Sequence, residues 1–342
     1  MLIYDLTLPE LAEHLQNIGE PGYRARQIWE GLYRQFWQTP AEFTPLPGSL
    51  RSRLGELFEF QSLEPVRIYE SPDGETIKTL FHLHDRRPIE AVLMRYRARR
   101  TLCISTQSGC AMGCVFCATG QMGFGRHLSS GEIVAQVIHY ARLLNDEGQQ
   151  VTNVVVMGMG EPFHNYDNTL AAIDRLNDSQ GYNFGARRFT ISTVGLVPAI
   201  RRFTQEKRQV NLAISLHAAG NELRSSMLPV NRSYPIEEVI LACRDYVRET
   251  GRRVTFEWAL VNGVNDSEAE AQRLATLLKG LLCHVNAIPL NPTSGYPGQG
   301  TTRERASAFQ DILTRAGIPC TIRLRRGIDI QAGCGQLAVE GK

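Results

Sequence analysis

The segment GCAMGCVFCATG, residues 109–120, contains Cys110, Cys114 and Cys117 in a C-x3-C-x2-C arrangement. A structural zinc ion is held by four protein ligands in a closed site. Cysteine thiolates also hold iron–sulfur clusters, and a [4Fe–4S] cluster has four irons. Three protein ligands would leave one iron open to another ligand, which indicates a catalytic rather than a structural site. A zinc site would need a distant fourth ligand such as Cys103 or Cys334 and is the weaker interpretation.

Short β-branched segments alternate with amphipathic segments around and after this run. The predicted strands begin near residues 101, 152, 188, 210, 253, 284 and 320. Helical periodicity is found between several of them, in residues 130–144, 168–176, 235–250, 266–281 and 303–317. This alternation predicts an α/β fold with a parallel sheet. Six βα units and a trailing strand predict a partial (β/α)6 barrel, with its chemistry in loops at the carboxyl ends of the strands.

The rest of the chain has a different pattern. Residues 1–60 predict a small helical accessory domain, with basic amphipathic helices at 23–36 and 47–58. Residues 61–100 predict a β-rich linker with a hairpin turn at Asp73-Gly74. Residues 101–342 would then form the barrel. Basic helices are usually solvated faces, although a nucleic-acid contact remains open here.

Composition limits the class of protein. The chain has 342 residues, of which 43% are hydrophobic and 21% charged, which is typical of a folded globular protein. Its start lacks the pattern of a secretory signal, and no segment reaches the ~18 apolar residues of a membrane span, so we expect a cytoplasmic protein that does not enter a membrane. Eight cysteines are too few for a disulfide scaffold in a chain of this length.

The positive charge is almost entirely arginine. Only four of the 37 basic residues are lysines, and arginines cluster in residues 95–100, 201–203 and 323–326. Arginine binds phosphate bidentately and stacks on bases, as an RNA-binding protein requires. A genome that prefers arginine codons is the alternative explanation.

The cysteine run also carries a resemblance. With Phe116 before its last cysteine, and with the Gly-x-Gly-Glu turn of VVVMGMGEP (residues 154–162) after the next strand, it resembles the signature of the radical S-adenosylmethionine (SAM) enzymes. The segments YRARQIWEGLY, TLCISTQSGCAMGCVFCATGQMGF, GMGEP, ISTVG, SLHA, LNP and GIDIQAGCGQL are similar, in order and spacing, to the RlmN/Cfr family of radical SAM RNA adenine methyltransferases. The resemblance extends from residue 23 to residue 337.

The resemblance implies a cofactor set and its ligands. Cys110, Cys114 and Cys117 would hold a [4Fe–4S] cluster whose open iron binds SAM. The positions that match the family's SAM contacts are Gly160, Glu161, Ser192, Ser215, Leu216, His217 and Asn291. Without the resemblance, His217 would be taken as a histidine at the end of a strand.

The resemblance also implies three catalytic residues. Cys334, in a C-terminal catalytic loop, would accept a methyl group from one SAM and carry it as a one-carbon bridge to the adenine. Cys103 would then attack the sulfur of Cys334 and release the base as a transient disulfide forms. Glu90 would be the base that removes the proton from the substrate carbon. From the residues alone, a lone cysteine is more often a small buried hydrophobe.

The implied substrates are an adenosine of 23S rRNA near the peptidyl-transferase centre and the adenosine 3′ of the anticodon in tRNA. We expect methylation at C2, because CATGQMGFGRHLSSGEIVAQV is closer to that branch, but the C8 branch shares the same residues. A flavodoxin-type electron donor and a monomeric state are further expectations. The alternatives are a radical SAM enzyme with another substrate and a non-catalytic iron–sulfur or zinc RNA-binding protein, which would have four protein ligands and no use for Cys334.

Overall fold

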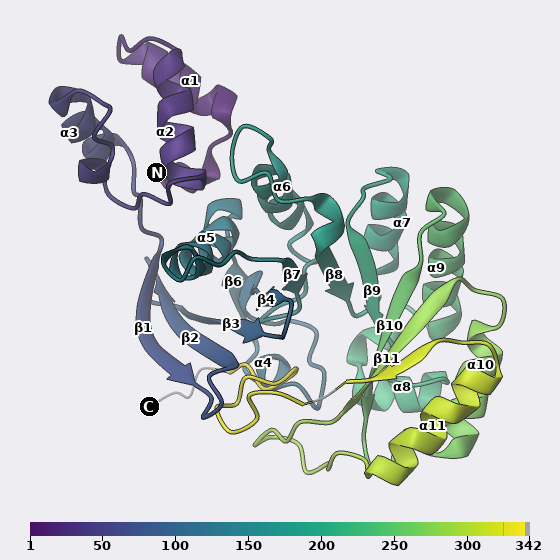
Figure 1. Ribbon diagram of the computed structural model, residues 1–342. Helices are drawn as coiled ribbons and strands as arrows, with labels where there is room; N and C mark the ends of the chain where they lie inside the picture. Colours follow the sequence, from purple (N-terminus) through teal and green to yellow (C-terminus); the bar gives the residue numbers. More distant parts are fainter. Residues whose placement is uncertain (324, 339–342) are drawn as a thin grey trace.

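The computed structural model describes residues 1–323 and 325–338. Leu324, within the last predicted strand, and residues 339–342, at the end of the predicted barrel domain, lie outside the described residues. A single ten-stranded sheet organises the chain, with the strand order β1-β2-β3-β4-β7-β8-β9-β10-β11-β12 (Figure 1). A second sheet contains only β5 and β6. Among the described residues no helix is both long and apolar enough to cross a lipid bilayer.

The main sheet begins with an antiparallel end. It is formed by the strands β1 (Leu63–Glu70), β2 (Thr76–Leu83), β3 (Pro88–Arg95) and β4 (Arg100–Cys103). Gly74 lies in the turn between β1 and β2 with a φ of +68°, a conformation that glycine adopts without strain. Residues 61–100, expected as a linker, thus extend the main sheet, because β3 pairs with β4.

The remaining pairs of the main sheet are parallel. They join β4 to β7 (Asn153–Val156), β8 (Phe189–Thr193), β9 (Asn211–Ser215), β10 (Val254–Leu260), β11 (Cys283–Pro289) and β12 (Cys320–Ile322). These seven strands correspond to the predicted ones. The pairs within the described part of the chain run in a linear order with β1 and β12 at the edges, so the predicted α/β fold with a partial barrel is confirmed.

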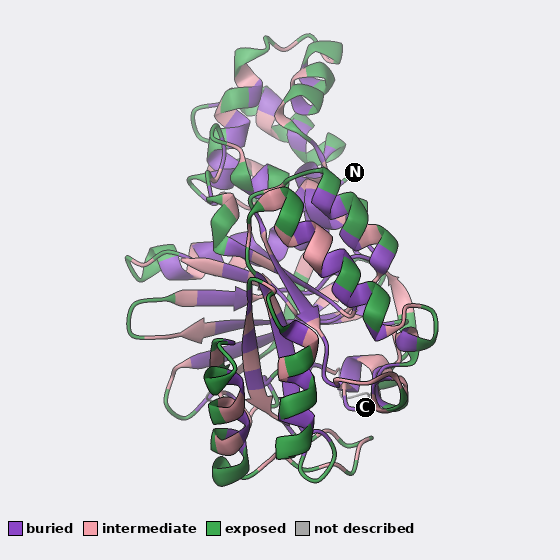
Figure 2. Cartoon of the chain, turned by 90° about the vertical axis from the view of Figure 1, so that its right-hand side faces the viewer, coloured by how far each residue is buried: buried purple, intermediate pink, exposed green. Residues whose placement is uncertain are grey.

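The crossovers of the parallel strands contain helices. These are α5 (Ser130–Asp146), α6 (Tyr166–Asn177), α7 (Val197–Gln205), α8 (Asn221–Met227), α9 (Ile236–Thr250), α10 (Glu268–Leu278) and α11 (Arg303–Arg315). Their inward faces are buried and their outward faces exposed (Figure 2). The α5 helix begins at a capping box in which Ser129 and Glu132 satisfy each other's backbone. The sequence analysis missed α7, which has a proline in its first turn and is only nine residues long.

Several short elements complete this part of the chain. They are β5 (Gln107–Gly109), α4 (Ala118–Gln121), β6 (Phe124–His127) and the 3-10 turns η3 (Ala186–Arg188) and η4 (Pro229–Arg232). The elements β5 and α4 flank the cysteine run, so the run is fixed on both sides by regular structure.

The N-terminal segment is helical. It contains η1 (Ile3–Asp5), α1 (Leu8–Asn17), α2 (Tyr23–Tyr33), η2 (Pro40–Glu42) and α3 (Gly48–Leu57). The helices α2 and α3 correspond to the two predicted ones, whereas α1 was not predicted even though Thr7 and Glu10 form a capping box at its start. In Figure 1 these helices project from one end of the sheet.

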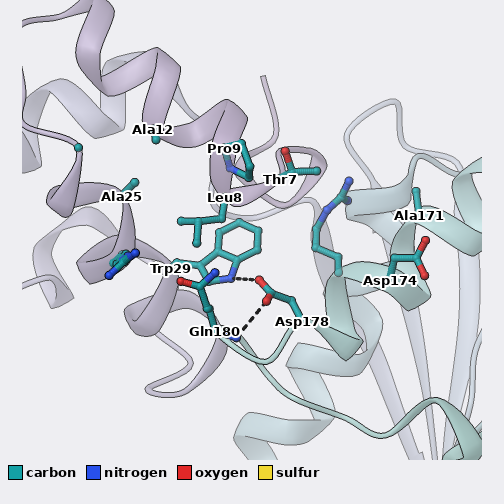
Figure 3. Close-up of a pocket in the computed structure, with 13 residues that line it drawn as sticks. Thr7, Leu8, Pro9, Ala12, Ala25, Trp29, Ala171, Asp174, Asp178 and Gln180 are labelled. Atoms are coloured by element: carbon teal, nitrogen blue, oxygen red, sulfur yellow. Dashed lines mark hydrogen bonds between the residues drawn. The ribbon is translucent and has the colours of Figure 1, made fainter.

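A hollow of about 630 Å³ lies where α1 and α2 face α6. Figure 3 shows Leu8 and Trp29 on one side and Asp174 and Asp178 on the other. The Nε1 of Trp29 donates a hydrogen bond of 2.8 Å to the carboxylate of Asp178, which connects α2 to the end of α6. This hollow is lined from elements other than those that carry the cysteine run.

Candidate active site

The cysteine run forms a tight loop between β5 and α4. The backbone N–H of Cys110 donates to the carbonyl of Gly123, and the N–H of Cys117 donates to the carbonyl of Cys114. Cys110 and Cys114 are buried and Cys117 is half-buried. Burial raises the pKa of the Cys110 thiol to about 12 and that of Cys114 well above its usual value, and the neighbouring thiolates raise both pKa values further. These thiols therefore stay protonated until a cation displaces the protons.

The run has an apolar wall. Phe116 lies edge-on to the ring of His217, with 4.9 Å between the centroids, and packs in a small apolar cluster with Leu228 and Leu290. Among the described residues, no group of three His, Cys, Asp or Glu side chains is arranged to hold a single metal ion. A four-iron cluster makes a different demand, because its thiolates bind separate irons. Three neighbouring thiols on one loop, shielded on one side by apolar side chains, fit that demand.

The Gly-x-Gly-Glu turn follows β7 and reaches the run. Gly160 has a φ of +103°, and a Cβ there would lie 2.6 Å from the side chain of Gln107, so only glycine fits. Glu161 is buried, and its carboxylate accepts hydrogen bonds from the N–H groups of Phe163 and Val194. Burial raises the pKa of Glu161 to about 7 against the effect of these bonds. The negative charge of Glu161 also raises the pKa values of Cys110 and Cys114, so the carboxylate lies beside the run.

The ends of β8 and β9 supply four more of the predicted residues. The hydroxyl oxygens of Ser192 and Ser215 are 3.3 Å apart. Leu216 follows β9, and His217 has a positive φ of 60°. The Nδ1 of His217 accepts a hydrogen bond from the N–H of Ala259, so the neutral ring carries its proton on Nε2. Burial lowers the pKa of His217 to about 3, which keeps the ring neutral.

Asn291, just after β11, connects this group to the C-terminal loop. Its Nδ2 donates to the carbonyl of Cys334 at 3.1 Å. Its Oδ1 is buried and has no hydrogen-bond partner within the described part of the chain. An unsatisfied buried acceptor is costly, and a ligand that donates a hydrogen bond removes the cost. This acceptor fits the adenine amino group or ribose hydroxyls of SAM.

The loop that carries Cys334 is fixed to α4, directly after the cysteine run. The N–H of Ala118 donates to the carbonyl of Gly335, and the hydroxyl of Thr119 donates to the carbonyl of Leu337. Cys334 keeps contact with solvent, yet the protein around it raises the pKa of its thiol to about 12, chiefly through desolvation and then through the charges of Cys103, Glu257 and Cys117. The structure thus brings Cys334 close to Cys103 and to the cysteine run.

Strand register places the other two predicted catalytic residues on one face of the sheet. Cys103 on β4 lies opposite Val92 on β3, and Glu90 is two residues before Val92. Opposite residues in an antiparallel pair, and residues two apart on a strand, share a face. Glu90 is buried, and its carboxylate lies 3.0 Å from the Nζ of Lys78. Burial raises the pKa of Cys103 to about 12.

Three polar residues of the site were missed from sequence. Gln107 accepts from the N–H of Glu161 and contacts His127 and His164 with its amide nitrogen. Glu257, on β10, has its pKa raised by burial and accepts a hydrogen bond from Asn286. Lys78 was noted only as one of the few lysines. Charged residues inside otherwise apolar strands, such as Glu257 in RVTFEWALV, are the signal that could have identified two of these.

Comparisons with known proteins agree with this arrangement. The model of the radical SAM superfamily matches residues 104–275, and the model of the ribosomal RNA large subunit methyltransferase N-terminal domain matches residues 2–60. A probable dual-specificity RNA methyltransferase RlmN from Chloroflexus aurantiacus is 50% identical, over 98% of this chain and 92% of that protein. The dual-specificity RNA methyltransferase RlmN 1 from Myxococcus xanthus is 49% identical, over 98% and 93%.

A solved structure is similar over the whole chain. The crystal structure of a radical SAM methyltransferase from Sphaerobacter thermophilus has a TM-score of 0.98 and 55% sequence identity, and covers 99% of this chain and 100% of that one. Radical SAM proteins use a [4Fe–4S] cluster and SAM, which the donor set described above fits. The chain therefore belongs to the RlmN family of radical SAM methyltransferases.

Proposed function

We propose that this protein methylates C2 of an adenosine in 23S rRNA, at the peptidyl-transferase centre, and C2 of the adenosine 3′ of the anticodon in tRNA. The observation that carries the proposal is the attachment of the Cys334 loop to α4, which begins directly after Cys117. A thiol held beside a radical-generating cluster is suited to carry a one-carbon unit. The relatives' names, dual-specificity RNA methyltransferase, support RNA as the substrate.

The cofactors would be held by two groups of residues. We assign the cluster to Cys110, Cys114 and Cys117. Glu161 would accept hydrogen bonds from the ammonium of SAM, because its carboxylate is buried beside the run. The remaining proposed SAM contacts are Gly160, Ser192, Ser215, Leu216, His217 and Asn291. When bound and reduced, the cluster supplies the electron that cleaves SAM to a carbon radical.

The protein's own residues perform the other steps. Cys334 would lose its proton and take a methyl group from one SAM. This S-methyl group would then give a hydrogen atom to the adenosyl radical formed from a second SAM, and its carbon would bond to C2 of the adenine, so that one carbon bridges the sulfur and the base. Glu90 would accept the C2 proton of the adenine. Cys103, as a thiolate, would attack the sulfur of Cys334 and form a disulfide. The electron pair of the broken carbon–sulfur bond would stay with the bridging carbon, which takes up a proton to become the methyl group, and the one electron left from the radical addition would return to the cluster. Both thiols have raised pKa values, so each needs a proton acceptor before it reacts.

We also propose the division of labour along the chain. Residues 1–60 would form the accessory domain that contacts RNA, residues 61–100 the β-rich connection, and residues 101–342 the catalytic unit with the Cys334 loop. Arg26 on α2 is exposed and available for phosphate contacts. The protein would act in the cytoplasm as a monomer and would receive its electrons from a flavodoxin-type donor.

The test is nucleoside mass spectrometry of 23S rRNA and tRNA from cells that lack these methyl groups, after anaerobic incubation with the reconstituted protein, SAM and a reductant. We expect 2-methyladenosine in both RNAs, and none with the Cys334→Ala protein. The presence of 8-methyladenosine would move the site of methylation to C8. SAM cleavage without any methylated adenosine would overturn the RNA assignment.

A further inference from the structure

Lys78 is a buried lysine in the middle of β2, where an ion is costly. Its side chain is 5% exposed and that of Glu90 is 3% exposed, and the distance from Nζ to Oε1 is 3.0 Å. Removing two charges from water is costly, and their attraction often does no more than offset that cost. A buried ion pair is therefore weak evidence of a contribution to stability. We therefore consider a role for Lys78 and Glu90 in the reaction rather than in the stability of the fold.

The register explains why the pair faces the catalytic cysteines. Lys78 lies opposite Val92 on β3, and Val92 lies opposite Cys103 on β4, so Lys78 and Cys103 share a face of the sheet with Glu90. The other face is covered by α5, where the hydroxyl of Tyr140 bonds to Thr79. The Lys78 face is thus the one that the C-terminal loop covers.

Lys78 touches that loop directly. Its Nζ lies 3.3 Å from the carbonyl oxygen of Gln331, three residues before Cys334. Thr76, two residues earlier on β2 and on the same face, packs against Gly327, where a Cβ would lie 2.8 Å from the threonine methyl. Figure 1 shows this segment returning beside β2. One ammonium group therefore joins the carboxylate of Glu90 to the backbone of the loop that presents Cys334.

We propose that Lys78 is a positioning residue for RNA methylation: it holds Glu90 as a carboxylate and holds the Cys334 loop over it. This inference rests on the proposed function, in which Glu90 takes the proton from the adenine. Three titratable groups lie around Glu90: Lys78 on β2 is its ion-pair partner, Cys103 on β4 lies on the same face of the sheet, and Tyr140 of α5 interacts with it electrostatically from the other face. Of these three groups, Lys78 is the one that forms an ion pair with Glu90.

The test compares Lys78→Met, Lys78→Arg, Glu90→Gln and the double variant Lys78→Met/Glu90→Gln in single-turnover methylation of 23S rRNA, across a range of pH. We expect Lys78→Met to lose about 10²-fold at neutral pH, because general bases contribute on that scale. Its acid limb should move to higher pH, because a buried carboxylate that loses a neighbouring cation is protonated more easily. Lys78→Arg should keep the wild-type limb. The double variant should be no slower than Glu90→Gln, which shows that Lys78 acts through Glu90.

A second measurement does not depend on RNA. Hydrogen exchange of residues 327–337 should be faster in Lys78→Met than in wild type, and unchanged in Lys279→Met, a matched lysine variant at the exposed end of α10. Because this readout needs no methylation, failure of the proposed function and failure of this inference are distinguishable. Unchanged exchange, an unmoved acid limb, or losses that multiply in the double variant would each overturn the inference. If Lys78→Met does not fold, hydrogen exchange of residues 327–337 in the double variant, which removes both charges, is compared with that in Glu90→Gln, and equal exchange in the two would overturn the inference.

Discussion

The cysteine run and the pair Cys103–Cys334 lie in the same site but are assembled in different ways. The run is a local structure, set by spacing and by backbone bonds within one loop. The pair comes from the first parallel strand and from the C-terminal loop: strand register places Cys103 on the face of the sheet that this loop covers, and bonds to α4 hold the loop. Local spacing is visible in a sequence, whereas long-range register is not. The comparison also separates the two proposed activities, radical generation and methyl transfer.

The largest expected effect is the loss of the cluster when one cysteine of the run is replaced. Cys114→Ala should abolish cluster incorporation and SAM cleavage together, because two remaining thiolates do not hold a four-iron cluster. Cys334→Ala should keep both and lose only RNA methylation. Iron and sulfide content, visible absorption and release of 5′-deoxyadenosine measure the difference. Cluster loss in Cys334→Ala would mean that this residue is a fourth ligand and would support the non-catalytic alternative.

The next effect distinguishes the role of Cys103 from that of Cys334. Cys103→Ala should allow the one-carbon bridge to form but not to be resolved, so the protein should accumulate covalently bound RNA and stop before a full turnover. A denaturing gel with labelled RNA detects the adduct. Cys320→Ala, at a half-buried cysteine on β12, is the control and should turn over normally. An adduct-free Cys103→Ala protein with normal turnover would remove Cys103 from the mechanism.

A smaller effect concerns the affinity for SAM, which we attribute in part to Glu161 beside the cysteine run. Glu161→Gln should weaken SAM binding by about 10- to 100-fold, since a hydrogen bond to a charged group contributes about 1.5–3 kcal/mol. The raised pKa of about 7 adds a pH dependence: below it Glu161 is protonated and loses its attraction for the ammonium, so wild-type affinity should fall as pH falls through 7. Equilibrium binding at several pH values measures both. In Glu161→Gln this dependence should disappear, and its persistence would assign it to another group.

The smallest effect lies outside both cysteine groups. Trp29→Phe removes the hydrogen bond to Asp178 while it keeps an aromatic ring, so it should lower the free energy of unfolding by about 1 kcal/mol. Thermal unfolding measures this loss. Cluster content and SAM cleavage should stay at wild-type levels. A loss of SAM cleavage would show that the N-terminal helices support the run as well.

Much of the fold could be predicted from sequence because its signals are local. The seven parallel strands were found from β-branched runs, and α5 from its apolar periodicity. The short helix α7 and the N-terminal helix α1 were missed, although both begin with recognisable signals, a proline in the first turn and, for α1, a capping box. The placement of β1–β3 within the main sheet depends on pairing partners that no local pattern specifies.

The residues of the candidate site also divide into those with a local sequence signal and those without one. The spacing of the cysteine run and the glycines of residues 158–160 point to a cofactor without any structure. Glu90, in contrast, resembles an ordinary strand residue, and only the family resemblance singled it out. Its partner Lys78 and the amide of Gln107 were not identified at all, because their meaning lies in contacts between strands, loops and the C-terminal segment. Polar residues inside strands are informative only once the register is known.

The position of the short helix α4 matters for protein engineering. It begins directly after Cys117 and holds the loop of Cys334 through bonds from Ala118 and Thr119, so the cysteine run and Cys334 are attached to the same short helix. A designer who remodels α4 would therefore move the proposed carrier thiol, Cys334, and the proposed cluster ligands together.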